Sequence, residues 1–291
     1  MTTKTMRVKD GRRVAVHAHE GSTDGRTVLF LHAAPGAGLL DPAPEVTTER
    51  SVTLVGVDRP GYGGSDPVPP GEWPSVDGAA DEAAEVLDRL GRDRVGVVGW
   101  SAGGRVALAL AARHPDLVDR VVVAGTPAPH EEVPWIPADH AASLDALRTL
   151  DPEQALGALA GQLGPMNEAA KDPEVALELI GRSPADEAAL AEPGVRQRLL
   201  ATVEAAFLQG PVGLVADIAS YTLRPWGFEP ADVRAETLLL YGSADPVAGA
   251  AHGRWWQQNL RTARLEMLPG AGHLLIVPTW QRILSYLAPR R

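Results

Sequence analysis

The residues best suited to chemistry in this sequence surround one serine. Ser101 stands in the segment Gly99-Trp100-Ser101-Ala102-Gly103, between a run of buried-strand character (residues 95–99) and a helical pattern that begins near Arg105. A serine on a sharp strand-to-helix turn carries its hydroxyl above the sheet, next to the positive end of the following helix. Small neighbours allow such a turn to close. The pattern predicts a nucleophile at Ser101; the alternative is a serine in an ordinary glycine-rich turn.

A serine hydroxyl needs a base, and one histidine has suitable surroundings. His273 follows a strand-like run (264–268) through Pro269-Gly270-Ala271-Gly272, a loop that can bring an imidazole to Ser101. We therefore predict that His273 takes the serine proton. The competing histidines fall in the first hairpin, in another motif, at helix ends or in a helical block: His17, His19, His32, His114, His130, His140 and His252.

The base needs a carboxylate to hold it, and Asp245 is the candidate. It comes just after a strand-like run (237–241), at the end of a strand where such sheets present functional groups. It would accept the Nδ1 proton of His273 and fix the tautomer. The alternative is a turn aspartate, because Ala244-Asp245-Pro246 is a good turn sequence. The other candidate position for this carboxylate follows the preceding strand, where the sequence Gly125-Thr126-Pro127 has no acidic residue.

Strand-like runs alternate with helical patterns and predict the sheet that positions these residues. Several runs are nearly continuous in Val and Leu, as expected for strands covered on both faces. With helical patterns at 76–90 and 105–114, the alternation predicts an α/β fold with a mostly parallel, doubly wound sheet. Asp10-Gly11 predicts a hairpin and an antiparallel edge. The predicted strands are 6–9, 14–19, 27–32, 52–57, 95–99, 121–124, 237–241 and 264–268.

A helical block interrupts the alternation. From about residue 128 to 225 the chain is rich in Ala, Leu, Glu and Arg and has no convincing strand. The sheet needs the strands on both sides, so we predict a core of residues 1–127 and 226–291 with an inserted block, 128–225; a separate domain is the alternative. Helices are predicted at 138–150, 152–163, 173–180, 195–208 and 211–219.

Composition limits the possible functions. The 291 residues carry a formal net charge of -10, and such a surface argues against nucleic-acid binding. Without cysteine there is no disulfide, thiolate metal site or cysteine nucleophile. His130, Glu131 and Glu132 lack the partners of a metal site, and no cofactor is expected.

The chain start and its apolar runs bear on location. The polar first ten residues do not resemble a secretory signal, and no apolar run approaches the roughly 20 residues of a membrane span. We expect a soluble, cytoplasmic protein that acts on a small molecule; the sequence leaves its oligomeric state open.

Several motifs in a fixed order resemble the α/β-hydrolase superfamily, specifically its cap-bearing serine hydrolases with a Gly-x-Ser-x-Gly-Gly elbow. The resemblance covers nearly the whole chain and implies an eight-stranded sheet with the block as a helical cap. The motifs are Leu31-His32-Ala33-Ala34-Pro35-Gly36, Asp58-Arg59-Pro60-Gly61-Tyr62-Gly63-Gly64-Ser65, the elbow, Gly242-Ser243-Ala244-Asp245 and Gly270-Ala271-Gly272-His273.

The resemblance also implies an oxyanion hole. The backbone N–H of Ala102 is one expected donor. The family's His-Gly-x-Pro loop reads His32-Ala33-Ala34-Pro35 here, which implies the N–H of Ala34 as the second donor. Ala33 replaces the usual glycine. If that position demands a positive φ, alanine costs about 1 kcal/mol or the loop takes another path.

The activity implied by the resemblance is that of a carboxylesterase-like serine hydrolase, which cleaves an ester or related acyl bond through an acyl-enzyme. Relatives with the same Ser-His-Asp triad, which corresponds to Ser101, His273 and Asp245 here, also hydrolyse C–C bonds, transfer acyl groups or form peracids. A proline-specific aminopeptidase and a non-catalytic receptor are further alternatives. Epoxide hydrolases and haloalkane dehalogenases place Asp where Ser101 stands. Candidate pocket residues are Trp100, Trp135, Met166 and Phe207, with Ile136, Tyr221 and Trp226.

Overall fold

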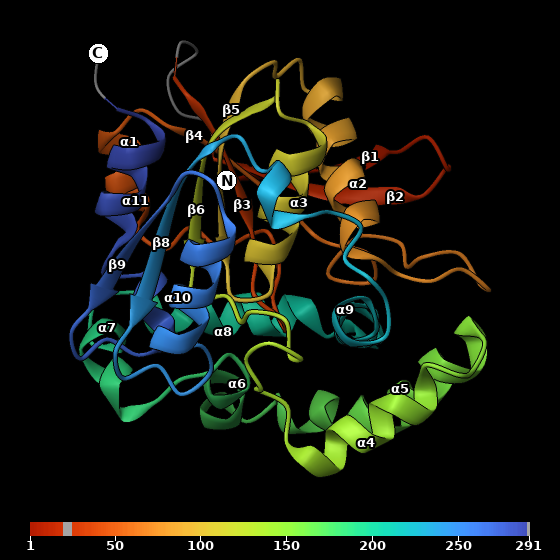
Figure 1. Ribbon diagram of the computed structural model, residues 1–291. Helices are drawn as coiled ribbons and strands as arrows, with labels where there is room; N and C mark the ends of the chain where they lie inside the picture. Colours follow the sequence, from red (N-terminus) through yellow and green to blue (C-terminus); the bar gives the residue numbers. More distant parts are fainter. Residues whose placement is uncertain (20–24, 290–291) are drawn as a thin grey trace.

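A computed structural model describes residues 1–19 and 25–289 and has an eight-stranded sheet at its centre (Figure 1). The strand order is β1-β2-β4-β3-β5-β6-β8-β9. β1, β2 and β4 pair antiparallel, and every other neighbouring pair is parallel. The predicted α/β sheet is confirmed. Its strands are β1 (Thr2–Arg7), β2 (Arg13–His19), β3 (Thr27–Leu31), β4 (Thr53–Val57), β5 (Val95–Trp100), β6 (Val118–Ala124), β8 (Glu236–Gly242) and β9 (Ala263–Leu268).

The first hairpin forms where Asp10-Gly11 predicts it. Gly11 has φ 89°, and Asp10 Oδ1 accepts the N–H of Arg12 at 2.9 Å. The first strand begins at Thr2, earlier than the predicted residue 6, because its polar residues pair in register with β2 as far as Ala18.

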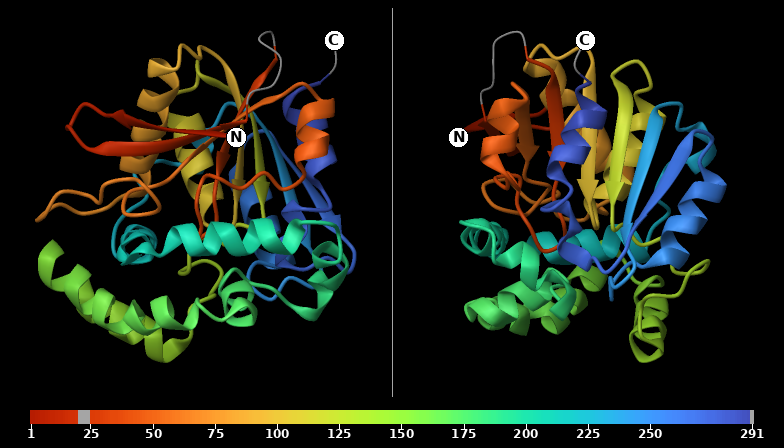
Figure 2. Two further views of the ribbon diagram at one scale, coloured as in Figure 1. Left: turned by 180° about the vertical axis from the view of Figure 1, so that it is seen from behind. Right: turned by 90° about the vertical axis from the view of Figure 1, so that its left-hand side faces the viewer.

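Helices cover both faces of the sheet (Figure 2). Along β3, Leu29 and Leu31 pack with one group of helices, whereas Val28 and Phe30 pack with the other. Burial on both sides explains why the strand sequences are continuously apolar. The first group is α2 (Val76–Arg89), α3 (Gly103–Arg113) and α10 (Ala250–Asn259); the second is α1 (Pro44–Glu49) and α11 (Trp280–Leu287).

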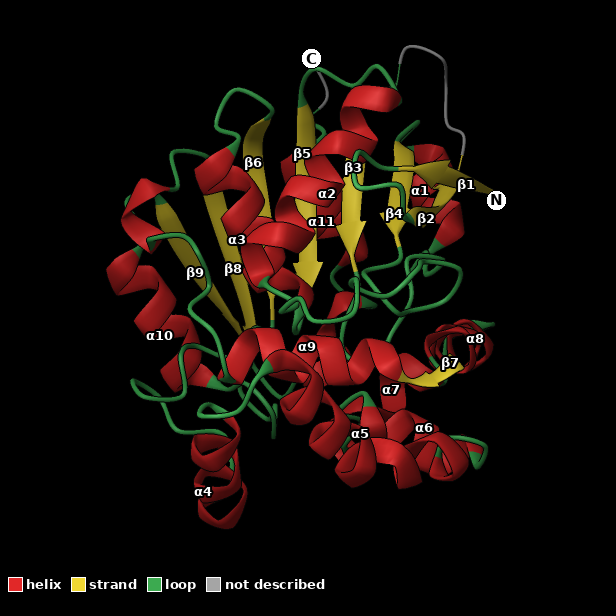
Figure 3. Cartoon of the chain, turned by 90° about the vertical axis from the view of Figure 1, so that its right-hand side faces the viewer, coloured by secondary structure: helices red, strands yellow, loops and turns green. Residues whose placement is uncertain are grey.

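Between β6 and β8 the chain is mostly helical, and α8 (Val195–Ala206) and α9 (Val212–Thr222) lie across the carboxyl ends of the strands (Figure 3). Leu144, Leu159 and Val215 belong to a small hydrophobic cluster of this segment's own. The segment consists of α4 (Ala138–Leu147), α5 (Pro152–Ala169), α6 (Pro173–Leu179), α7 (Glu187–Leu190), α8 (Val195–Ala206), β7 (Leu208–Pro211) and α9 (Val212–Thr222), with short 3-10 turns at Pro184–Asp186 and Pro230–Asp232. A further 3-10 turn, His273–Ile276, follows β9.

This segment differs from the prediction in several details, among them the additional short helix α7. α5 continues past residue 163 and includes Pro165, and β7 is a short strand outside the main sheet. The β7 sequence Leu-Gln-Gly-Pro is not apolar or alternating, so no pattern indicated it. No helix in the described ranges is long and apolar enough to cross a lipid bilayer.

Candidate active site

Ser101 lies in the tight turn between β5 and α3. Its φ of 53° falls in the left-handed region, which non-glycine residues seldom adopt. The Ser101 N–H donates to Ala124 O at 2.8 Å, and Ser101 O accepts from Thr126 Oγ1 at 2.7 Å. Hydrogen bonds from the end of the neighbouring strand therefore hold both peptide groups of Ser101 in this conformation.

The glycines beside Ser101 are required by close backbone packing. A Cβ on Gly103 would lie 2.1 Å from Leu31 O, and one on Gly104 would lie 2.0 Å from Thr126 Oγ1. Both distances are far below van der Waals contact, so the elbow fits against β3 and β6 only with glycine at these positions.

We predict that Gly103→Ala lowers ester hydrolysis by at least about 100-fold and the free energy of unfolding by about 1–3 kcal/mol. The added methyl must push the elbow away from the Leu31 carbonyl and so displaces Ser101. Rate assays and denaturant unfolding measure both effects. The matched control is Gly157→Ala, on an exposed helical position where a Cβ meets nothing within 4 Å. Equal activity of the two variants would contradict this account of the elbow.

His273 and Asp245 complete a hydrogen-bonded chain that begins at Ser101. His273 Nε2 lies 2.9 Å from Ser101 Oγ, and His273 Nδ1 lies 2.8 Å from Asp245 Oδ2. The other carboxylate oxygen, Asp245 Oδ1, accepts the N–H groups of Val247 (2.8 Å) and Ala248 (3.0 Å). The structure thus brings together the three side chains predicted from sequence, each at the carboxyl end of a different strand.

The surroundings keep Asp245 ionised. Burial raises the pKa of its carboxyl group, but His273 and the N–H groups of Ala248 and Val247 outweigh burial and hold that pKa below its ordinary value of 3.8. An ionised Asp245 accepts a hydrogen bond from the Nδ1–H group of His273. This tautomer leaves the Nε2 lone pair facing Ser101 Oγ. The arrangement can activate a serine for attack on a carbonyl.

Two further contacts hold the backbone around His273. Trp100 Nε1 donates to His273 O at 3.0 Å, and the N–H of Leu274 donates to Asp186 Oδ1 at 2.9 Å. Asp186 comes from the helical segment between β6 and β8 and is buried. Sequence reasoning missed this contact, because the local sequence marks Asp186 only as the partner of Ser183 in a capping box and not as an acceptor for Leu274.

The loop after β3 takes a path on which Ala33 is unstrained. Among the non-glycine residues in the described ranges only Ser51 and Ser101 have a positive φ, so the conditional cost at Ala33 does not arise. Ala33 is buried in the core, and the Ala34–Pro35 bond is cis. No hydrogen bond within the described part of the chain uses the N–H of Ala34 or Ala102. These two N–H groups therefore have no hydrogen-bond partner among the described residues.

The four candidate pocket residues have different surroundings. Trp100 is fully buried, and half-buried Phe207 packs against the same core cluster. Trp135 lies elsewhere: its Nε1 donates to Ala128 O, and its ring faces Arg105. Met166 is half-buried on α5.

Arg105 is a buried cation that sequence reasoning did not single out. Its guanidinium carbon lies 5.1 Å from the ring centre of Trp135, 4.6 Å from Tyr221 and 5.0 Å from Trp226. Burial lowers its pKa to about 10. The rings stabilise the charge and connect α3 to both ends of the helical segment.

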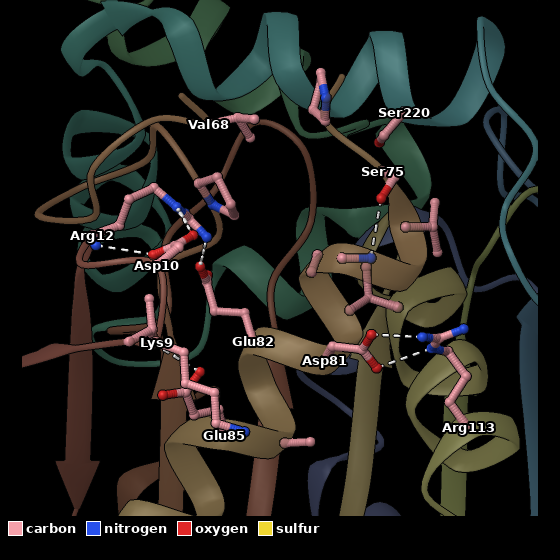
Figure 4. Close-up of a pocket in the computed structure, with 18 of the residues that line it drawn as sticks. Lys9, Asp10, Arg12, Val68, Ser75, Asp81, Glu82, Glu85, Arg113 and Ser220 are labelled. Carbon is pink, nitrogen blue, oxygen red and sulfur yellow. Dashed lines mark hydrogen bonds and ion pairs between the residues drawn. The ribbon is translucent and has the colours of Figure 1, made fainter. Parts of the chain in front are cut away.

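A groove of about 960 Å³ lies between α2 and α9 (Figure 4). None of Ser101, Asp245 and His273 lines it. Its charged side chains pair with one another, as in Arg12–Glu82 and Arg113–Asp81. We read it as a solvated face.

His252 makes the stability of the protein depend on pH. Its Nδ1 accepts the Ala128 N–H at 3.1 Å, and burial together with the charge of Arg105 lowers its pKa from 6.5 to about 4. The unfolded chain therefore binds this proton at higher pH than the folded chain, and the free energy of unfolding falls as the pH drops from 6.5 toward 4.

Asparagine at position 252 retains an acceptor for the Ala128 N–H but does not titrate. We predict that between pH 7 and pH 5 the free energy of unfolding falls by about 2 kcal/mol less in His252→Asn than in the wild type. Urea unfolding at the two pH values measures the difference. Identical pH dependence in the variant and the wild type would show that His252 is not the titrating group.

Comparison with known proteins gives a consistent picture. A family model described as alpha/beta hydrolase fold matches residues 26–278. The pimeloyl-[acyl-carrier protein] methyl ester esterase of Chromobacterium violaceum is 28% identical over 91% of this chain and 93% of that protein. A putative carbamate hydrolase of Caulobacter segnis is 38% identical, but over 45% of this chain and 48% of that protein. A solved hydrolase from Pseudomonas aeruginosa PA01 aligns over 99% of both chains, with 24% identity and a TM-score of 0.75.

Proposed function

This chain belongs to the alpha/beta hydrolase fold family, and on that premise we propose that it is a serine hydrolase that cleaves a carboxylic ester through Ser101, His273 and Asp245. The observation that carries the proposal is the continuous chain of short hydrogen bonds from Ser101 Oγ through His273 to Asp245. Such a hydrogen-bonded arrangement makes a weakly nucleophilic hydroxyl group reactive at neutral pH.

The proposed reaction has two halves. Ser101 Oγ attacks the ester carbonyl carbon while His273 Nε2 takes the hydroxyl proton, and the N–H groups of Ala34 and Ala102 stabilise the oxyanion. His273 returns the proton to the leaving alcohol, which leaves an acyl group on Ser101. Water, activated by His273, then releases the carboxylic acid and restores the enzyme.

The choice of an ester rests on the relative that aligns over nearly its full length. That relative is a methyl ester esterase. The carbamate hydrolase, which aligns over about half of each chain, supports a second candidate: an amide-like acyl bond attacked by the same serine. An oxyanion hole and an activated serine serve both bonds.

We also propose that residues 128–225 form a cap that selects the substrate. α8 and α9 lie across the carboxyl ends of the strands (Figure 1). Ser101, Asp245 and His273 follow the carboxyl ends of β5, β8 and β9. Gly181, within this segment, is so close to His273 that a Cβ there would lie 2.5 Å from Cδ2 of the imidazole. This close approach to the proposed base supports a role for the segment as a cap.

The test of the proposed function is hydrolysis of p-nitrophenyl esters of increasing acyl length, with p-nitrophenyl carbamates in parallel. We expect saturable ester hydrolysis, with a rapid first release of p-nitrophenol equal to the enzyme concentration wherever deacylation is slow. Faster turnover of carbamates would favour the second candidate. No turnover of either series above the uncatalysed rate would refute both.

A further inference from the structure

A buried ion pair connects the helical segment to the loop that carries the proposed oxyanion donor. Arg59 follows β4, and Asp217 lies on α9. Arg59 Nε donates to Asp217 Oδ1 at 3.0 Å, and Arg59 Nη2 donates to Asp217 Oδ2. Tyr62 also donates its hydroxyl proton to Asp217 Oδ2, at 2.9 Å. All three side chains are buried, so the pair is shielded from solvent.

The same guanidinium holds the loop after β3. Arg59 Nη1 donates to His32 O at 2.6 Å, and Arg59 Nη2 donates to Ala33 O at 3.1 Å. His32 Nε2 accepts the N–H of Arg59 at 3.2 Å, so its Nδ1 carries the proton and donates to Ala33 O at 2.7 Å. Burial and the Arg59 charge lower the pKa of His32 well below its ordinary value, which keeps the ring in this neutral form.

The carbonyl of Ala33 belongs to the peptide unit that carries the N–H of Ala34. A trans peptide is planar, and its C=O and N–H point in opposite directions. The only cis bond in the described ranges follows Ala34, so the Ala33–Ala34 peptide is trans. The two hydrogen bonds that fix Ala33 O therefore also fix the direction of the Ala34 N–H.

We propose that Arg59 and Asp217 are positioning residues: docking of α9 orients Arg59, and Arg59 orients the oxyanion donor on Ala34. The inference rests on the proposed function. The hydrogen bond from Arg59 keeps the Ala34 N–H in a fixed direction, although Ala33 stands where this motif usually has glycine. This arrangement also makes the oxyanion hole complete only when the helical segment is seated on the core.

The test uses the double variant Arg59→Met/Asp217→Leu, which removes the pair without leaving a buried charge alone. We expect kcat for a p-nitrophenyl ester to fall about 10- to 100-fold while KM changes by less than about threefold, because the donor acts in the transition state. The Ki of an alkyl trifluoromethyl ketone, whose hemiketal with Ser101 carries an oxyanion, should rise by the same factor.

Two more variants separate positioning from general damage. Arg59→Lys retains a positive charge opposite Asp217, but one ammonium cannot reproduce the planar fork that also reaches Ala33 O, so it should fold and lose kcat similarly. The control is Gln209→Ala. Gln209 Nε2 joins the same helical segment to Gly63 O (3.0 Å) and Ser65 O (2.7 Å) without touching the oxyanion loop. We expect its kcat to stay within about twofold of wild type.

The outcomes distinguish this inference from the proposed function. In one outcome the wild type hydrolyses the esters while the folded Arg59 variants keep an unchanged kcat or change only in KM. That result overturns the inference and leaves the proposed function standing. An equal loss of kcat in Gln209→Ala overturns it as well, because any loosening of the segment would then suffice. A wild type that neither hydrolyses the esters nor binds the ketone overturns both.

Discussion

Ser101→Ala should lower kcat/KM for p-nitrophenyl ester hydrolysis by about 10⁴- to 10⁶-fold, to a residual rate set by binding and the oxyanion hole. The substitution removes the atom that accepts the acyl group and leaves the hydrogen bonds of the Ser101 backbone to Ala124 and Thr126 intact. Its effect on folding should be small, because alanine and serine pay a similar cost at a φ of 53°. Steady-state kinetics and thermal unfolding measure both.

The chain supplies a closely matched control for this change. Ser51 has the same φ of 53°, but it lies on the exposed turn before β4, far along the chain from the triad. Ser51→Ala therefore reproduces the side-chain and backbone change without touching the site, and its activity should equal that of wild type. An active Ser101→Ala enzyme would mean that another group attacks the substrate.

Asp245→Asn should lower kcat by about 10³- to 10⁴-fold with little loss of stability. The amide oxygen can still accept the N–H groups of Val247 and Ala248, as Oδ1 of the aspartate does. That places the amide NH₂ against His273 Nδ1. The imidazole must then carry its proton on Nε2, where it cannot accept the hydroxyl proton of Ser101.

The loss in Asp245→Asn should appear in kcat far more than in KM, and circular dichroism should show an unchanged fold. The exposed Asp145→Asn, which removes one charge from a surface pair with Arg148, serves as the control. A kcat for Asp245→Asn within about tenfold of wild type would exclude a role for Asp245 in holding the proposed base.

The sheet was predictable because its strands carry their own signature. Val28, Leu29 and Phe30 are buried on alternate faces, so the run is apolar throughout, and turn residues separate one such run from the next. α11 lacked a cap that would mark its start, yet Trp280, Ile283 and Leu284 have the spacing of a helix buried on one side. This spacing alone indicates the helix from the sequence.

The positions of the proposed triad were predictable for a different reason: each residue lies on the turn or short loop that follows a strand, so chain order and sheet topology fix where it lies. The residues that support them were not. Asp186 and Asp217 reach Leu274 and Arg59 across 88 and 158 positions of sequence, and no local pattern records such a contact. The motif at Asp58-Arg59 is visible in the sequence, but the path of a distant loop determines which carbonyl groups accept hydrogen bonds from Arg59.

The most direct test of the central claim is covalent labelling with a fluorophosphonate, followed by mass mapping of the modified peptide. The account predicts one adduct on Ser101 of the wild type and labelling slowed by at least about 100-fold in His273→Ala, with Ser51→Ala labelled at the wild-type rate. No adduct on Ser101, or equal labelling of wild type and His273→Ala, would contradict the claim that His273 activates Ser101 as a nucleophile.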